Sequence, residues 1–156
     1  MKSKIIKRTE INSLVRKLKR KGNKVVFTNG VFDIIHRGHV EYLLKAKSLG
    51  DVLIVGLNTD NSVKKFKDKN RPVNKQRDRA IVLLALKPVD YVVFFNEERP
   101  DKLIEEVQPD ILVKGSDYKL NEIAGAKFVK SYGGQVKRIR FIHGYSTSKI
   151  IKKLLQ

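Results

Sequence analysis

Short runs of consecutive apolar residues alternate along this chain with longer segments in which apolar residues recur at helical spacing. The short runs are rich in Val, Ile and Phe, and such continuous hydrophobicity is typical of strands that are buried on both faces of a sheet. We predict strands over residues 24–28, 52–57, 91–95, 111–113 and 136–141. We predict helices over residues 10–21, 38–48, 75–86, 100–107, 122–132 and 147–155.

Strands and helices that alternate at this spacing form parallel strands joined by right-handed crossovers. The sequence therefore predicts an α/β fold: a single Rossmann-like, doubly wound parallel sheet of about five strands with helices on both faces. For the first helix we expect Thr9 as the N-cap and Gly22 as the residue that closes it. No repeat or Pro/Gly/Ser-rich linker marks a second domain, so we expect residues 1–156 to form one domain, with 1–22 as an N-terminal helical extension.

The net charge of +18, from 34 Lys and Arg against 16 Asp and Glu, raises nucleic-acid binding as one interpretation. The basic residues are spread over 2–21, 64–79, 114–119 and 127–153, with no single basic arm and no interleaved aromatic platform. This distribution favours a lysine-rich, solvated surface over a nucleic-acid footprint. A basic nucleic-acid-binding module stays open as an alternative of a different class.

The sequence has no membrane span, no signal-peptide core and no cysteine, and this limits the compartment and the chemistry that we expect. No apolar run approaches the roughly 18 residues that a membrane span needs, and the stretch 1–8 has no apolar signal-peptide core. We therefore expect a cytoplasmic protein without membrane insertion. The chain has no cysteine, which excludes disulfides, thiolate nucleophiles and cysteine-based zinc sites.

The segment 27–39, FTNGVFDIIHRGH, holds two of only three histidines at the junction between a predicted strand and a predicted helix. Free backbone N–H groups and the positive end of the helix dipole favour anions at such a junction. Gly30 allows a sharp turn, and Gly38 lets a phosphate approach the helix without meeting a Cβ. His36 and His39 can donate hydrogen bonds to phosphoryl oxygens whose charge grows in a transition state.

Two alternatives to a phosphate site stay open for this segment. One is a helix start that carries surface histidines, and the other is a metal pair to which Asp33 and a further, unidentified residue would contribute. A long polar stretch, 58–74, carries several lysines and is a candidate mobile loop over a site. In an open α/β sheet the ligand lies outside the carboxyl ends of the strands, where the strand order reverses.

Residues 30–39, GVFDIIHRGH, resemble the His-x-Gly-His signature of the cytidylyltransferase-like nucleotidyltransferases. Residues 144–149, GYSTSK, resemble the second element of that family, a glycine followed by a Ser/Thr-rich helix start. The family joins a nucleoside triphosphate to a phosphorylated alcohol or sugar and releases pyrophosphate. From about residue 24 to 155 the chain is similar to the branch that acts on heptose 1-phosphate, either as a free enzyme or as the C-terminal half of a bifunctional kinase and adenylyltransferase. The matching stretches are 27–30, 56–60, 71–74, 78–80 and 112–118.

The glycerol-phosphate branch carries an arginine three residues before its C-terminal glycine, where this chain has Phe141, with Arg140 adjacent. This departure weakens the interpretation as a cytidylyltransferase for glycerol 3-phosphate, which stays as an alternative together with an adenylyltransferase for another phosphate acceptor. The resemblance implies in-line attack by the sugar phosphate on the α-phosphorus of ATP. The product would be ADP-heptose for lipopolysaccharide or another surface polysaccharide.

The resemblance also implies roles for individual residues and for partners. The implied catalytic residues are His36, His39 and Lys67. The implied nucleotide-binding residues are Asn29, Gly30, Val31, Phe32, Gly38, Lys114, Gly115, Asp117, Ser146, Thr147 and Ser148. The implied substrate-binding residues are Asp33, Asn58, Asp60, Lys64, Arg71 and Tyr118, although Asp33 could instead orient its own loop. Mg²⁺ would bridge the oxygens of the triphosphate without a protein cage, and we expect a homodimer or a higher assembly.

Overall fold

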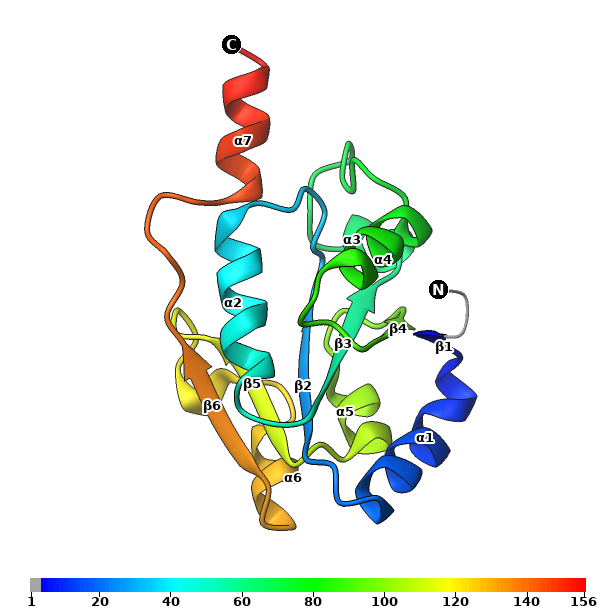
Figure 1. Cartoon of the computed structure of the whole chain (residues 1–156). Helices are drawn as coiled ribbons and strands as arrows, with labels where there is room; N and C mark the ends of the chain where they lie inside the picture. Colours follow the sequence, from blue (N-terminus) through cyan, green and yellow to red (C-terminus); the bar gives the residue numbers. More distant parts are fainter. Residues whose placement is uncertain (1–3) are drawn as a thin grey trace.

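Six parallel strands form one sheet in the order β1-β4-β3-β2-β5-β6 in the computed structural model, which describes residues 4–156 (Figure 1). The strands are β1 (Ile5–Ile6), β2 (Val25–Gly30), β3 (Val52–Asn58), β4 (Tyr91–Phe95), β5 (Ile111–Gly115) and β6 (Gln135–Ile139). The helices are α1 (Arg8–Arg20), α2 (Arg37–Lys47), α3 (Asp60–Lys64), α4 (Gln76–Ala85), α5 (Asp101–Val107), α6 (Ala126–Ser131) and α7 (Thr147–Leu154), with a 3₁₀ turn, η2 (Leu120–Glu122). The predicted α/β class and parallel sheet are confirmed, and the sheet is one strand larger than predicted.

Helices cover both faces of the sheet, and each face has its own apolar core. On one face α2 and α4 bury residues such as Leu43 and Leu83 against the central strands. On the other face α1, α5 and α6 bury residues such as Ile11, Ile104 and Val129. This arrangement explains the continuous apolar runs, because a strand covered on both faces has no polar side. β3 shows this most completely, since all of its residues are buried.

The strand order reverses at β2, which lies between β3 and β5. The chain first adds β3 and β4 on one side of β2 and later adds β5 and β6 on the other side. The connections that follow β2 and β5 therefore run in opposite directions from the carboxyl ends of these strands. An open α/β sheet has a crevice at such a point. The segment that carries His36 and His39 starts at this edge.

Four details differ from the sequence-based expectations. β1 was not predicted, because its two residues are too few for a pattern and become a strand only by pairing with β4. The expectation that Thr9 caps the first helix is wrong, since α1 starts at Arg8 and no side chain caps it. The expected helix over 122–132 is shorter, because Gly125 adopts a left-handed conformation and separates η2 from α6. The polar stretch 58–74 contains the short helix α3.

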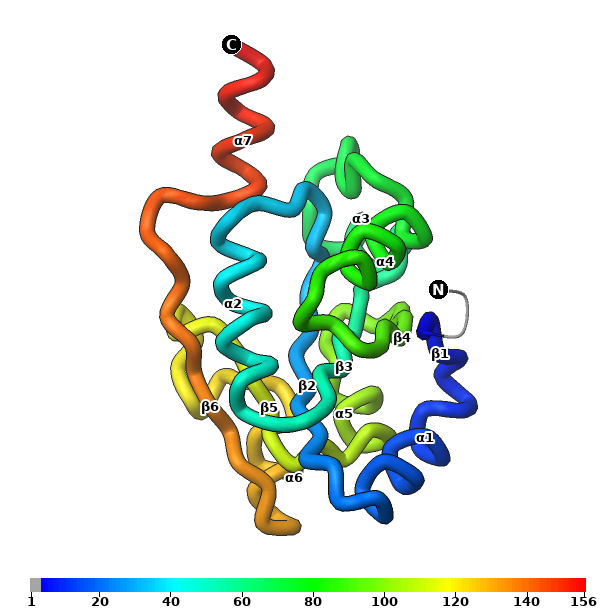
Figure 2. Tube along the Cα trace, in the orientation of Figure 1, coloured from blue at the N-terminus to red at the C-terminus, as the bar shows by residue number. Residues whose placement is uncertain are grey.

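The two ends of the described chain differ in how they join the body. α1 packs against α5 and buries Ile11 and Val15, so the described part of the expected 1–22 extension belongs to the layer that covers the sheet. Residues 1–3 lie outside the described residues. α7 projects beyond the body at the end of the trace, above α2 (Figure 2). Over residues 4–156 we find no helix with the length and apolar character needed to traverse a bilayer.

Candidate active site

A cleft of about 660 Å³ opens at the carboxyl ends of β2 and β5. Most of the residues that the sequence singled out line it, namely Asn29, Gly30, Val31, Phe32, Asp33, His36, His39, Asn58, Lys67, Arg71, Lys114, Asp117, Tyr118, Ser146, Thr147 and Ser148. Gly115 lines a smaller cavity of about 200 Å³ that shares Asn29, His39 and Lys114 with the cleft. Gly38, Asp60 and Lys64 line neither space. The cleft therefore collects residues from segments more than a hundred positions apart.

The two histidines form a stacked pair at the start of α2. Their ring centroids lie 3.9 Å apart with 24° between the ring planes. The backbone N–H of His36 donates to Nδ1 of His39 at 3.4 Å. Because Nδ1 of His39 accepts this hydrogen bond, the proton of the neutral ring lies on Nε2, where it can be donated to a ligand. Nδ1 of His36 is buried and has no hydrogen-bond partner within the described chain.

Both imidazoles favour the neutral form. Burial lowers the pKa of His39 to about 4, and the nearby His36 lowers it further. Burial also lowers the pKa of His36. Two stacked rings that were both charged would repel each other, so neutrality agrees with the stacking geometry. At neutral pH the pair therefore offers N–H dipoles, and not positive charges, to a ligand.

We expect the lowered pKa of His39 to appear in the pH dependence of stability. The unfolded chain binds this proton near pH 6.5 and the folded chain only near pH 4, so the free energy of unfolding falls as pH drops through that window. The loss attributable to His39 is at most about 3 kcal/mol. In urea denaturation, the free energy of unfolding of His39→Gln should fall between pH 7 and pH 4 by up to about 3 kcal/mol less than that of the parent chain.

The matched control is His143→Gln at an exposed position outside the cleft, which should follow the parent profile. Parallel profiles for His39→Gln and the parent chain would show that His39 is not held neutral by the fold.

Two glycines in the motifs leave room for aromatic side chains. A Cβ on Gly38 would lie 3.0 Å from the His36 ring and 3.1 Å from Cβ of Tyr145. A Cβ on Gly115 would collide with the ring of Phe141 and the carboxylate of Asp117. In this structure the space over Gly38 is therefore occupied by His36 and Tyr145, whereas the sequence had suggested an approaching phosphate.

Lys114 lies at the end of β5, on the side of the cleft that faces β2. Its ammonium donates to Oδ1 of Asn29 at 3.3 Å and lies 5.0 Å from the centre of the Tyr118 ring. Burial lowers the pKa of Lys114 to about 8, although the nearby Asp117 acts in the opposite direction. A partly desolvated cation beside the histidine pair can recognise an anionic group strongly, because its own hydration has already been reduced.

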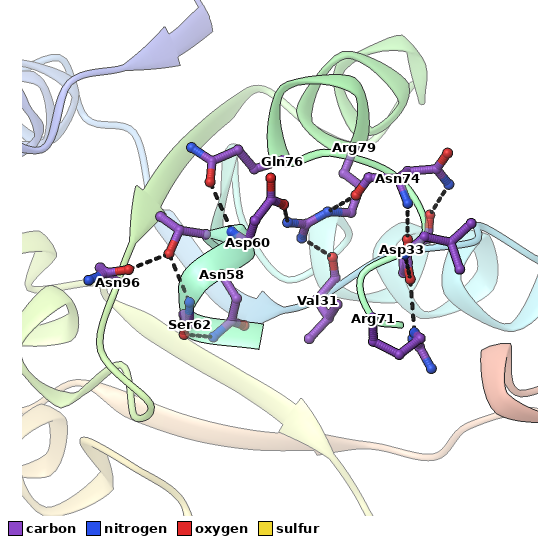
Figure 3. Close-up of polar contacts among 12 residues, drawn as sticks. Val31, Asp33, Asn58, Asp60, Ser62, Arg71, Asn74, Gln76, Arg79 and Asn96 are labelled. Atoms are coloured by element: carbon purple, nitrogen blue, oxygen red, sulfur yellow. Dashed lines mark hydrogen bonds and ion pairs between the residues drawn. The ribbon is translucent and has the colours of Figure 1, made fainter. Parts of the chain in front are cut away.

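Asp33 anchors the loop that follows β2 to the segment before α4, as Figure 3 shows. Its carboxylate is fully buried and accepts hydrogen bonds from Nε of Arg71 at 2.9 Å and from the backbone N–H groups of Val73 at 2.8 Å and Asn74 at 2.9 Å. The Asn74 side chain donates back to the Asp33 carbonyl at 3.0 Å. Of the two roles considered for Asp33, this geometry favours orientation of the loop.

Arg79 holds the same region from α4. Its buried guanidinium donates to the carbonyls of Val31 at 2.8 Å and Asn74 at 2.9 Å, and to the carboxylate of Asp60 at 2.8 Å (Figure 3). Asp60 therefore neutralises Arg79 and lies outside the cleft. Asn58 is also engaged within the chain, since its side chain donates to the hydroxyl of Ser62 at 2.9 Å. Arg79 and Asp60 therefore support the cleft from behind, while Asn58 lines it with a side chain that is already hydrogen-bonded.

The start of α7 forms the wall near the histidines. Ser146 caps this helix by accepting a hydrogen bond from the N–H of Lys149 at 3.1 Å. The hydroxyl of Thr147 donates to the carbonyl of Ile34 at 3.2 Å, which ties α7 to the loop before α2. Two helix starts, those of α2 and α7, therefore meet at one cleft, and each is suited to an anion.

Several aromatic residues of the cleft were not predicted as site residues. Tyr145 stacks over His36 at a centroid distance of 6.1 Å, and Phe141 stacks on Tyr42 at 5.0 Å. Phe66 enters from the polar loop, and all of these side chains except Tyr42 line the cleft. Their role depends on tertiary contacts, although the departure at Phe141 was a signal that this position is special.

Four acidic residues line the cleft, and one of them, Asp33, is engaged by Arg71. Among residues 4–156, no group of three His, Asp or Glu side chains lies close enough to hold a metal ion. Glu98, Asp117 and Glu122 line the cleft as separate carboxylates. Such a donor set suits a Mg²⁺ ion that arrives on a triphosphate and keeps most of its waters.

Comparison with known proteins decides between the interpretations of the histidine motif. The cytidylyltransferase-like family matches residues 27–153, a range that includes both helix starts. The chain belongs to the cytidylyltransferase-like family. The family membership predicted from the two motifs is thereby confirmed.

Curated relatives match this chain over part of their own length. The bifunctional protein HldE of Wolinella succinogenes is 51% identical over 150 residues, covering 96% of this chain and 31% of that protein. The bifunctional protein HldE of Helicobacter pylori is 51% identical over 144 residues, covering 92% of this chain and 30% of that protein. The chain thus spans about a third of the length of the curated relatives it matches.

Solved structures share the fold. The lipopolysaccharide core biosynthesis protein of Thermoplasma volcanium is 32% identical with a TM-score of 0.63, covering 78% of this chain and 98% of that chain. A pantoate-beta-alanine ligase of Francisella tularensis is 20% identical with a TM-score of 0.59, covering 97% of this chain and 80% of that one. The second likeness concerns the fold alone.

Proposed function

We propose that this member of the cytidylyltransferase-like family transfers AMP from ATP to heptose 1-phosphate and releases pyrophosphate. The observation that carries the proposal is the stacked pair of neutral histidines at the start of α2, which shares its cleft with the start of α7. Nucleotidyl transfer is mostly positioning and charge stabilisation, so it needs oriented donors and no covalent nucleophile. The product would be ADP-heptose for a surface polysaccharide.

In the proposed reaction, an oxygen of the sugar phosphate attacks the α-phosphorus of ATP in line. A new P–O bond joins the two phosphates, and the bond from the α-phosphorus to the bridging oxygen of the β-phosphate breaks. Negative charge grows on the non-bridging α-oxygens, and Nε2–H of His39 together with His36 would donate to them. The N–H groups and hydroxyls of Ser146, Thr147 and Ser148 would hold the departing pyrophosphate.

Cations around the cleft would neutralise the two substrates. Lys67 lines the cleft from the polar loop, and Lys114 lines it from β5. Arg71 lines it as well, while its Nε is held by Asp33. We propose Lys67 for the triphosphate and Lys114 for the acceptor phosphate or the nucleotide. Asp33 at the edge of the cleft and Asp60 behind it would act as positioning residues.

The choice of acceptor rests on the heptose-branch stretches, above all LVKGSDY at 112–118, which provides Lys114, Asp117 and Tyr118. The similarity to a lipopolysaccharide core biosynthesis protein supports an acceptor from surface polysaccharide synthesis. Because the reaction consumes ATP, the proposal places it in the cytoplasm. The expectation of a homodimer or higher assembly stays a prediction.

Affinity for the anionic substrate should depend on the charge of Lys114. Since the pKa of Lys114 is about 8, the cationic form prevails at pH 7 and is mostly lost at pH 9. If only this form binds, the dissociation constant should rise by about tenfold over that interval. Calorimetric titration with ATP and with the sugar phosphate shows which ligand depends on Lys114.

Lys114→Arg provides the matched comparison, because its charge persists above pH 9. This variant should bind with little pH dependence, while Lys114→Gln should bind weakly throughout. A parent chain whose affinities for both ligands stay constant from pH 7 to pH 9 would exclude Lys114 from anion recognition.

A panel of nucleotides and acceptors tests the proposed function. ATP should raise the melting temperature more than CTP or GTP does, and pyrophosphate should form when ATP and heptose 1-phosphate are both present with Mg²⁺. Pyrophosphate release from CTP with glycerol 3-phosphate, without release from ATP and heptose 1-phosphate, would assign the chain to the cytidylyltransferase alternative.

A further inference from the structure

The last helix is amphipathic along its whole length, yet none of its residues is buried. Ile150, Ile151, Leu154 and Leu155 recur at i, i+1, i+4 and i+5, which places them on one face of a helix. The opposite face carries only lysines among its charged residues, namely Lys149, Lys152 and Lys153. The side chains of Leu154 and Leu155 are 78% and 83% exposed. The leucine end of this apolar face therefore lacks a partner within residues 4–156.

Within the described residues, α7 is tied to the body near its first turn. Its first residue is tied to the body through the hydrogen bond from Thr147 to the carbonyl of Ile34. From there α7 runs away from the body, and its C-terminal turn stands clear of every other element (Figure 1). Ile150 and Ile151, near the fixed end, are half-buried, while the two leucines one turn later are exposed. The C-terminal turn is therefore presented outward.

The segment of the sequence that leads into α7 and includes it carries charge of one sign. No aspartate or glutamate follows Glu122, so every charged Lys, Arg, Asp or Glu side chain from there to the end is a lysine or an arginine. The preceding strand β6 lies at an edge of the sheet and exposes Lys137 and Arg138. The distribution of charge is thus uneven, although basic residues occur throughout the sequence. A partner of this end of the molecule should be strongly anionic.

The combination of lysines and exposed leucines selects among anionic partners. A nucleic acid would be bound by the cations alone, and two projecting leucines would not contribute to that binding. A second copy of this chain would bring the same positive charge to the contact and would be repelled. A bilayer with anionic headgroups meets both requirements, because it attracts lysines and accepts apolar side chains at the boundary of its acyl region.

We propose that α7 docks this protein on the surface of a membrane rich in anionic phospholipids. Leu154 and Leu155 enter the boundary between headgroups and acyl chains, while Lys152 and Lys153 flank them and reach the headgroup phosphates through their flexible stems. The helix of 8 residues is only about 12 Å long, so it lies at the surface and does not cross the bilayer. The cleft beside the start of α7 would then face the layer of solution next to the membrane.

The test is co-sedimentation of the full chain with vesicles of phosphatidylcholine, with and without phosphatidylglycerol. We expect binding only to the vesicles that contain phosphatidylglycerol. Lys152→Glu together with Lys153→Glu should lower the partition coefficient by more than about tenfold, since each lysine near an anionic surface contributes roughly fivefold. Leu154→Ser together with Leu155→Ser should lower it as well and make the remaining binding more sensitive to salt.

Arg16→Glu together with Lys17→Glu is the matched control, because it changes the net charge equally on the exposed face of α1. This pair should retain most of the binding, and circular dichroism should show that all variants stay folded. An equal loss for both charge reversals would assign the binding to bulk charge and would overturn the proposal.

Two further outcomes would also overturn it. If vesicles are not bound and sedimentation velocity shows an assembly that Leu154→Ser/Leu155→Ser dissociates, a second copy covers the apolar face. If vesicles are not bound and duplex DNA is bound at the same salt concentration, the basic surface serves a nucleic acid.

Discussion

Replacing either His36 or His39 with alanine should slow turnover by about 100-fold or more, which corresponds to roughly 2.7 kcal/mol of lost transition-state stabilisation. The two rings stack at 3.9 Å, so each presents its N–H group from a fixed position to the same part of the cleft. The loss should appear mainly in kcat, because the charge that these groups stabilise grows during the reaction. Steady-state pyrophosphate release measures the effect.

The third histidine provides the control for this experiment. His143 is exposed and does not line the cleft, so His143→Ala should keep turnover within about twofold of the parent chain. Melting temperatures show whether the cleft variants stay folded. Near-normal turnover of folded His36→Ala or His39→Ala would refute the assigned role of that histidine.

Asp33→Ala should lower the free energy of unfolding by about 3–5 kcal/mol. The substitution removes the partner of Arg71, whose side chain is only 10% exposed, and leaves the N–H groups of Val73 and Asn74 without an acceptor. The buried charge of Arg71 would then be uncompensated, and two partly buried hydrogen bonds would be lost. Urea denaturation of the parent chain and the variant measures the difference.

A second substitution separates the lost ion pair from the lost side chain. Arg71→Met in the Asp33→Ala background removes the unpaired charge and should recover part of the stability. Glu41→Ala removes an exposed partner of Arg37 at 3.3 Å and should cost no more than about 0.5 kcal/mol. A cost below about 1 kcal/mol for Asp33→Ala would show that the loop is held mainly by other contacts.

The strands could be predicted from the sequence because a strand that is buried on two faces consists of consecutive apolar residues. Most helices could be predicted because a helix that packs on a sheet has apolar residues at helical spacing. The edge strand β1 could not, because two residues carry no pattern and the pairing with Val92 and Val93 defines it. The short helix α3 was missed for a related reason, since it starts with a Thr59 cap inside a polar stretch.

The residues of the candidate site also fall into two groups, those that the sequence could identify and those that it could not. Residues of the two motifs could be located because each motif sits at a helix start that follows a strand or a glycine. The network around Asp33 and Arg79 could not, because the contacts of Asp33 with the segment before α4 and of Arg79 with Val31 join residues about forty or more positions apart. For Asp60 the family resemblance implied a role in substrate binding, whereas the structure shows that its carboxylate accepts a hydrogen bond from Arg79.

We propose that the cleft of His36 and His39 transfers the α-phosphate of ATP, as AMP, to a sugar 1-phosphate. Reactions with ATP labelled with ³²P at either the α or the γ position test it most directly. With heptose 1-phosphate as the acceptor, the α label should appear in a sugar nucleotide and the γ label in pyrophosphate. Transfer of the γ label to the sugar, or release of the γ label as inorganic phosphate without a sugar nucleotide, would contradict the claim.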